Sequence, residues 1–141
     1  MTKENKELLV KDLCARLPYG VVVNYNGLVR PLFGIEPTQH FQITLDNALD
    51  GGHNGLVYVS LDVGGEEPKP YLRPMSSMTE EEEKEICQFM KDYNLLTGPN
   101  RAGVFCGKIV DWLNAHHFDY HGLIEKSLAL EAHKDMYKME G

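Results

Sequence analysis

The feature that most constrains this chain is a short stretch in which three consecutive valines lead into an Asn-Gly dipeptide. The valines are residues 21–23, and Asn26 and Gly27 follow before a second apolar run begins. β-Branched side chains favour extended strands. An Asn-Gly pair supplies the two positive φ angles that a type I′ turn requires. The sequence therefore predicts an antiparallel hairpin with strands over residues 20–25 and 28–35.

Two further stretches continue the strand pattern. Residues 40–45 alternate apolar and polar side chains, and residues 56–61 form a short apolar run. Such alternation is typical of a half-buried strand. Pro31 lies inside the second strand of the hairpin and has no N–H to donate, which predicts a sheet edge or a bulge there. We expect about four antiparallel strands, in a small curved sheet or partial barrel.

Helical patterns flank the strands on both sides. Residues 3–17 repeat leucines every four positions among charged side chains, which is typical of an amphipathic helix. Pro18 ends this helix, because the residue before a proline is pushed out of the helical conformation. Thr79 and Glu82 have the spacing of a capping box. They predict the start of another helix, whose apolar stripe continues to Tyr93.

The remaining C-terminal helices are predicted from apolar stripes and the turns between them. A helix from about Val104 to His116 carries Trp112 on its stripe, and residues 122–130 suit a short last helix, which makes about two or three helices after the sheet. A helix, consecutive strands and then helices define the α+β class. We expect one domain over the whole chain, with a loose tail at residues 133–141.

The charge balance limits the partners that the chain can bind. The net charge is −7, from 14 Lys and Arg against 21 Asp and Glu. Nucleic-acid binding gains much of its affinity by neutralising phosphates, so nucleic acid is not the expected partner. The same argument weakens binding to an anionic membrane. No apolar signal-peptide core interrupts the charged N-terminus, and the three cysteines form no CxxC pair. We expect a cytoplasmic protein with reduced thiols and no cofactor.

A cluster of histidines is the first candidate for chemistry. His116, His117 and His121 lie close together, and the last two are four residues apart, a spacing that on a helix places both on one face. Two imidazoles and a carboxylate can hold a transition metal. Residues 118–120 look like a helix end, however, where the helix dipole favours histidine without any metal. We therefore predict no metal, and an enzyme that uses residues 116–121 stays a functional alternative.

The cysteines offer a second route to chemistry. Cys106 lies near a predicted helix start, where a thiolate is stabilised, but no pattern identifies a base beside it. Cys14 and Cys87 fall beside apolar helical positions, so we expect them to fill the core. No catalytic residue is predicted.

The segment that joins the strands to the C-terminal helices is the best candidate for binding. Residues 68–74, which we call the strap, hold three prolines and should be stiff and extended. The strap would present Tyr71 and Arg73 at little entropic cost, and both residue types are common interface anchors. The alternative is a purely structural strap across the sheet. We also expect Trp112 to be buried between the last helices and the Tyr71–Leu72 part of the strap.

Three blocks of sequence carry a resemblance. They are Leu13-Cys-Ala-Arg-Leu-Pro-Tyr-Gly-Val21, Lys69-Pro-Tyr-Leu-Arg-Pro-Met-Ser-Ser-Met-Thr-Glu-Glu-Glu82, and Asp111-Trp-Leu-Asn-Ala-His-His-Phe-Asp-Tyr-His-Gly-Leu-Ile124 with its continuation to Ala132. Together they resemble a family of proteins from gut bacteria, their prophages and their phages, to which no function is assigned. The resemblance implies a prokaryotic cytoplasm and a mobile-element origin. It carries no catalytic residue over to this chain.

These observations favour a small accessory or binding protein that acts through protein–protein contacts. A DNA-transaction factor, or an acidic inhibitor of a nucleic-acid enzyme, is the first alternative, because the acidic run at residues 80–83 could imitate phosphates. An enzyme that uses residues 116–121 is the second. The oligomeric state stays open. The candidate binding residues are Tyr71, Arg73, Trp112, His116 and Tyr120.

Overall fold

The computed structural model describes residues 2–36, 41–49, 55–61, 67–95, 101–133 and 136–137, apart from the side chains within 89–95 and 101–107. Its elements are α1 (Lys3–Arg16), η1 (Leu17–Tyr19), β1 (Val22–Tyr25), β2 (Leu28–Glu36), β3 (Gln42–Leu45), β4 (Val57–Ser60), β5 (Lys69–Leu72), η2 (Met75–Ser77), α2 (Glu80–Leu95), α3 (Arg101–Ala115) and β6 (Leu130–Glu131). The α+β class is therefore confirmed. None of the helices in this part of the chain has the length and apolar character needed to cross a membrane.

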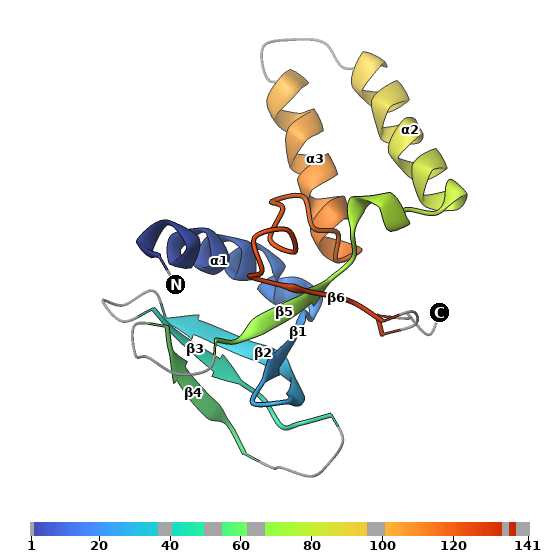
Figure 1. Ribbon diagram of the computed structural model, residues 1–141. Coiled ribbons are helices and arrows are strands. Elements are labelled where there is room, and N and C mark those ends of the chain that lie inside the picture. The colour runs from blue at the N-terminus through green and yellow to red at the C-terminus, as the bar shows by residue number, and fades with distance from the viewer. Residues whose placement is uncertain are drawn as a thin grey trace.

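The strands form one six-stranded sheet in the order β4-β3-β2-β1-β5-β6 (Figure 1). Neighbouring strands are antiparallel except β5 and β6, which are parallel. The predicted four-stranded antiparallel sheet is thus incomplete. β5 was not predicted, because the prolines of the strap argue against a strand there. β6 is too short to leave a recognisable pattern in the sequence.

The predicted hairpin is confirmed. β1 and β2 pair antiparallel, with Tyr25 opposite Leu28. Between them Asn26 and Gly27 take φ angles of 53° and 78°. Positive φ at both central residues is the geometry of a type I′ turn.

Pro31 lies in β2, which runs through the middle of the sheet, so the edge alternative was wrong. The bulge alternative holds two residues further on. The register between β2 and β3 shifts between Leu32 and Gly34, which leaves Phe33 as the extra residue of a β-bulge. The carbonyl of Pro31 accepts a bond from the Asp46 N–H at 2.9 Å. Proline cannot return such a bond, so the regular ladder breaks here.

The main core lies between α1 and one face of the sheet. Residues paired across strands share a face, so the register divides the sheet into two faces. The inner face carries Val23, Leu32 and Ile43, and Leu9 and Leu13 of α1 belong to the same buried cluster. α1 lies over this face in Figure 1. The opposite, outer face is described with the candidate site below.

α2 and α3 stand away from the sheet as a helical hairpin (Figure 1). Trp112, Leu113 and Phe118 form a second small core near the base of α3. The capping box that was predicted at the start of α2 is confirmed. The Thr79 N–H donates to Glu82 Oε1 at 2.9 Å, and the Glu82 N–H donates to Thr79 Oγ1 at 3.2 Å.

The helix predicted from about Val104 to His116 is confirmed as α3, although it begins earlier, at Arg101. The prediction of a third helix was wrong, because residues 122–130 form turns that lead into β6. Asp119 explains the turns, because its carboxylate accepts the backbone N–H groups of Leu123 and Ile124 at 2.8 and 2.9 Å. A side chain that satisfies these groups competes with helical hydrogen bonding.

Two other expectations concern single residues and the tail. Cys14 and Cys87 are exposed, so neither fills the core. The outward side of their helices accepts a small thiol as readily as the inward side. The side chain of Cys106 lies outside the described residues. A single domain and a loose tail at 133–141 stay predictions, since only three residues of that tail belong to the described part.

Candidate functional site

The residues predicted to bind a partner gather where β5 runs beside the segment that follows α3. The Arg73 N–H donates to the His117 carbonyl at 2.7 Å, and the Asp119 N–H donates to the Arg73 carbonyl at 2.8 Å. Arg73 and Phe118 form an isolated parallel bridge between these two contacts. We call this region the junction: residues 116–124, β5 with Arg73, and the C-terminal end of α1.

Most of the predicted binding residues are engaged inside the protein. Tyr71 and Trp112 are each only 7% exposed. Arg73 holds Glu82 with two hydrogen bonds of 2.7 Å, and its guanidinium carbon lies 4.2 Å from the centre of the Phe118 ring. The hydrogen bond from Arg73 is the main reason that the pKa of Glu82 falls to about 2. These contacts hold the junction together, and binding of a partner by these residues stays a prediction.

Trp112 is buried as expected, but among different neighbours. Its ring stacks on His116 at a centroid distance of 4.0 Å and on Phe118 at 5.7 Å. Its indole Nε1 donates to the carboxylate of Glu85 at 2.8 Å. Leu72 of the strap belongs to the main core, whereas Trp112 belongs to the second one. The second and third sequence blocks do meet at the junction, through the backbone bonds of the strap.

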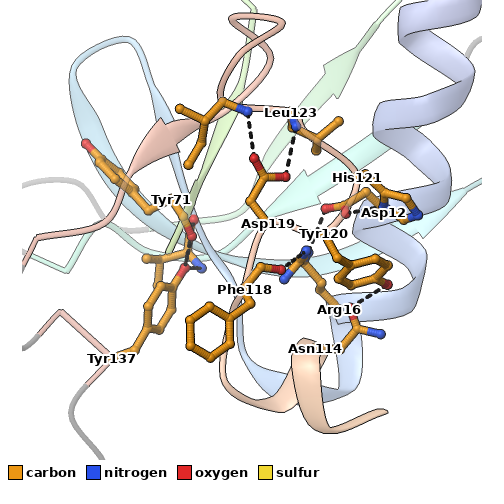
Figure 2. Close-up of polar contacts among 12 residues, drawn as sticks. Asp12, Arg16, Tyr71, Asn114, Phe118, Asp119, Tyr120, His121, Leu123 and Tyr137 are labelled. Carbon is orange, nitrogen blue, oxygen red and sulfur yellow. Dashed lines mark hydrogen bonds and ion pairs between the residues drawn. The ribbon is translucent and has the colours of Figure 1, made fainter. Parts of the chain in front are cut away.

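A buried charge network forms the centre of the junction (Figure 2). Asp12 and Arg16 are both fully buried, and the Arg16 Nε donates to Asp12 Oδ2 at 2.7 Å. The Arg16 Nη2 donates to the Phe118 carbonyl at 2.5 Å. His121 Nδ1 contacts the other carboxylate oxygen of Asp12 at 2.7 Å, so this nitrogen carries the proton. One carboxylate thus joins a guanidinium and an imidazole that come from distant parts of the chain.

Sequence reasoning missed Asp12 and Arg16. A usable signal existed, because residues 9, 12, 13 and 16 share one side of a helix. Two charged residues on a stripe of leucines indicate a buried pair or an interface. Tyr120, which was predicted, lies with its ring 5.2 Å from the Arg16 guanidinium, and its hydroxyl donates to Asn114 at 2.9 Å. Burial raises the pKa of Tyr120.

His117 lies just after the end of α3 in a left-handed conformation, with a φ angle of 63°. Its buried ring stacks on Tyr137 at a centroid distance of 3.6 Å. Burial, and next the positive charge of Arg16, lower the pKa of His117 to about 4. The ring is therefore neutral at neutral pH. Within the described part of the chain, His117 Nδ1 and Arg16 Nη1 are buried without a hydrogen-bond partner.

The three histidines of the sequence cluster diverge in the structure. No helix joins His117 to His121, as expected, because α3 already stops at Ala115, before the helix end that was expected at residues 118–120. His116 faces Trp112, His121 faces Asp12, and His117 lies against the C-terminal segment. Among the residues that the structure describes, no group of three His, Cys, Asp or Glu could hold a metal ion. The chemistry available here is a carboxylate that orients an imidazole, as in many proton-transfer sites.

Next to the junction, the C-terminal segment contacts β1 and β5, and Tyr71 on their outer face is buried. The Val22 N–H donates to the Tyr137 hydroxyl at 2.9 Å, and that hydroxyl donates to the Tyr71 carbonyl at 2.7 Å. Asn24, two residues along β1 on the same face, donates to the Tyr71 hydroxyl at 2.9 Å. Burial raises the pKa of Tyr137. We call this β1–β5 part the covered half.

The other half of the outer face, over β2, β3 and β4, exposes large apolar side chains, although Thr44 in its middle strand is buried. Gly34 pairs with Thr44, and Thr44 pairs with Tyr58, so these residues share the outer face. Phe33 follows the inward-facing Leu32 and is 59% exposed, while Tyr58 is 63% exposed. We call the exposed apolar side chains on this half the open face: Phe33, Tyr58 and Leu56, which precedes β4 and continues its alternation.

Sequence reasoning did not single out the open face. The apolar run at residues 56–61 predicts a strand, but not which side of that strand is covered.

Family models, curated proteins and solved structures were compared with this chain, and none matches. The two regions differ in kind: most polar groups of the junction bond to other groups of the protein, whereas the open face presents large apolar side chains to solvent.

Proposed function

We propose that this chain is a small binding protein that acts through protein–protein contact, and that the open face is its contact surface. The observation that supports this is the exposure of Phe33 and Tyr58 together on one side of the sheet. Neighbouring strands are about 4.8 Å apart, so side chains on β2 and β4 lie about 10 Å apart across the sheet. Single exposed apolar residues are ordinary, whereas grouped ones mark interaction sites.

The chemistry of the open face suits a protein partner. Aromatic side chains are enriched in interface cores, where they bury a large area at a low entropic cost. The segment from Gly55 to Leu61 carries no charged residue, although the chain has a net charge of −7. Contact here would therefore desolvate no charge from this segment.

The alternatives differ in the partner or in the region they use. An inhibitor of a nucleic-acid enzyme, which a phage or mobile-element origin would suit, is a binding protein whose partner is a nuclease or polymerase. An enzyme would use the Asp12–His121 pair, since the His121 side chain is 20% exposed and its Nδ1 is held by a buried carboxylate. Both are distinguished from the main proposal by where a partner or substrate binds.

Site-specific photocrosslinking tests the proposal. A photoreactive phenylalanine analogue replaces Phe33 in one protein and Met75, which is 44% exposed at the start of the helical hairpin, in a control. Each is irradiated in lysate of a gut bacterium that carries the gene. We expect one dominant protein adduct from position 33 and none of that mass from position 75. Excess unlabelled wild type should suppress the adduct, and excess Phe33→Lys should not.

Two outcomes would contradict the proposal. One is the absence of any saturable adduct from position 33. The other is an adduct that forms equally from both positions, or that Phe33→Lys suppresses as well as the wild type does. A nuclease or polymerase in the adduct would identify the chain as an inhibitor within the proposed class.

A further inference from the structure

The three strands of the open face direct their charged side chains to opposite faces of the sheet. The charged residues within β2, β3 and β4 are Arg30 and Glu36. Arg30 pairs with the inward-facing Val23 and is 6% exposed. Its guanidinium donates to the carbonyls of Asp46 and Gly55 at 2.9 and 3.2 Å. The cation of these strands is therefore engaged inside the protein.

The anion of these strands lies on the outer face. Ile35 pairs with Ile43, which belongs to the main core, so the next residue of β2 is directed outward. That residue is Glu36, and it is exposed. Within the described part of the chain, no ion pair holds its carboxylate. The open face therefore has a negative charge at its border.

Gly34 leaves an open space between this carboxylate and an aromatic ring. It follows Phe33 directly at the bulge and lies two residues before Glu36 on the same strand. A Cβ at Gly34 would meet nothing within 4 Å, so no side chain of the protein fills the space above its backbone. Gly34, Thr44 and Tyr58 form one row across the three strands. A partner's side chain can approach the sheet at Gly34, between Phe33 and Glu36.

We propose that the open face binds a basic segment of its partner, and that an arginine of this segment lies over Gly34, with its guanidinium against the Phe33 ring and paired with the Glu36 carboxylate. A cation within about 6 Å of an aromatic ring centre is attracted to the face of the ring. A planar guanidinium also matches a carboxylate with two parallel N–H groups. Because Gly34 and Glu36 are about 7 Å apart along the strand, one arginine can reach both groups.

The charge of the whole chain favours the same partner. A net charge of −7 attracts a basic segment over a distance and repels an acidic one. A purely apolar partner would cover the Glu36 carboxylate without pairing it, which costs free energy. The inference rests on the proposed function, because it names the chemistry of the partner that the open face binds.

Titration with a synthetic peptide tests the arginine. The probe is an acetylated and amidated peptide in which arginine alternates with glycine. The reference is the same peptide with citrulline, which has the shape of arginine without its charge. NMR spectra of the isotope-labelled protein give the dissociation constant and locate the contact. We expect saturable shifts of the Gly34 and Glu36 amides, and about tenfold weaker binding of the citrulline peptide.

Two substitutions separate the ring from the carboxylate. Phe33→Leu keeps an apolar side chain without a ring, and Glu36→Gln keeps the shape without the charge. Each should weaken binding of the arginine peptide about threefold. Glu36→Gln should leave binding of the citrulline peptide unchanged. Glu81→Gln is the matched control, because it removes the same charge from an exposed position in the first turn of α2 and should leave binding of both peptides unchanged.

Several results would overturn the arginine site: no saturable binding of the arginine peptide, equal binding of the citrulline peptide, an equal loss in Glu81→Gln, or shifts that concentrate at residues 80–83. These results are separable from those of the crosslinking experiment. A partner that crosslinks through position 33 by a segment without arginine removes this site and keeps the proposed function. Peptide binding at Gly34 without a saturable protein adduct from position 33 does the reverse.

Discussion

Tyr58 and Tyr71 are both strand residues on the outer face of one sheet, yet one is 63% exposed and the other 7%. Over Tyr71 lies the C-terminal segment, whose Tyr137 bonds to the Tyr71 carbonyl and whose His133 ring lies 5.7 Å from the Tyr71 ring. The described residues place no such segment over Tyr58. Strand chemistry alone thus does not decide which half of a sheet face is buried; a segment from elsewhere in the chain does.

The two halves should respond differently to substitution. In the covered half and the adjoining junction, side chains complete one another's hydrogen bonds, so their loss should lower stability. On the open face, side chains contact mainly solvent, and their loss should change binding and leave stability nearly unchanged. The predictions below test this contrast, beginning with the largest expected effect.

Arg16→Ala should destabilise the protein most, by about 3–5 kcal/mol, because it leaves the fully buried Asp12 carboxylate without its cationic partner. Urea titration measures the free energy of unfolding. Phe33→Lys on the open face is the matched control, and should change that free energy by less than about 0.5 kcal/mol. Similar losses in the two variants would remove the contrast.

Trp112→Ala should cost about 3–5 kcal/mol, because the ring is buried between His116 and Phe118. Thermal unfolding followed by circular dichroism measures the effect, since Trp112 is the only tryptophan available for fluorescence. Trp112→Phe keeps an aromatic ring and loses the bond to Glu85, so it should cost less. An alanine variant that melts like the wild type would show that the second core contributes little.

Acidification should destabilise the protein through His117. Its pKa is about 4 in the folded protein and 6.5 as the ordinary value, so the unfolded chain takes up a proton first as pH falls. The contribution is fully present above pH 6.5 and is lost down to pH 4. Its loss amounts to about 3 kcal/mol at 1.36 kcal/mol per pKa unit.

His117→Asn isolates that contribution, because asparagine tolerates the positive φ angle and does not titrate. Urea titrations at several pH values should show a flatter dependence for the variant between pH 6.5 and 4. Glu82 contributes separately, since its pKa of about 2 lies below the ordinary value of 4.5 and its stabilisation is lost only as pH falls below 4.5. Parallel pH profiles for wild type and variant would refute the role of His117.

Tyr137→Phe should cost about 1–3 kcal/mol, because the Val22 N–H and the Tyr71 carbonyl both lose their hydroxyl partner. Hydrogen exchange of the Val22 amide should become faster at the same time. Tyr58→Phe removes the same hydroxyl from the open face and should be close to neutral. If both variants are neutral, the covered half is not held by Tyr137.

Gly27→Val should have the smallest effect of the five, a loss of more than about 1 kcal/mol. Gly27 has a φ angle of 78°, and a Cβ there would meet nothing within 4 Å. The cost therefore comes from backbone strain in the turn and not from a clash. Asn26→Gly keeps the turn geometry and serves as the control. A Gly27→Val protein of wild-type stability would show that the turn adapts freely.

Local patterns predicted the elements whose stabilising contacts are themselves local. α1 follows its leucine stripe, the Asn26–Gly27 turn follows its positive φ angles, and α2 begins at the Thr79–Glu82 capping box. β5 was missed, because its buried Pro70 lacks the N–H that a central strand normally uses. The candidate binding residues gather at one place, the junction. The sequence did not predict that Tyr71 would be buried there.

By itself the sequence determined the α+β class, the hairpin, the first helix and the capped start of the second, since residues within four positions of each other decide these features. Only the tertiary structure decided that Asp12 and Arg16 are buried and that Tyr71 is covered while Tyr58 is open. Those outcomes depend on contacts such as that of Arg16 with Phe118, 102 residues apart. A local pattern shows whether a side chain is apolar, polar or charged. The segment that buries it is distant in the sequence, and only the folded chain brings the two together.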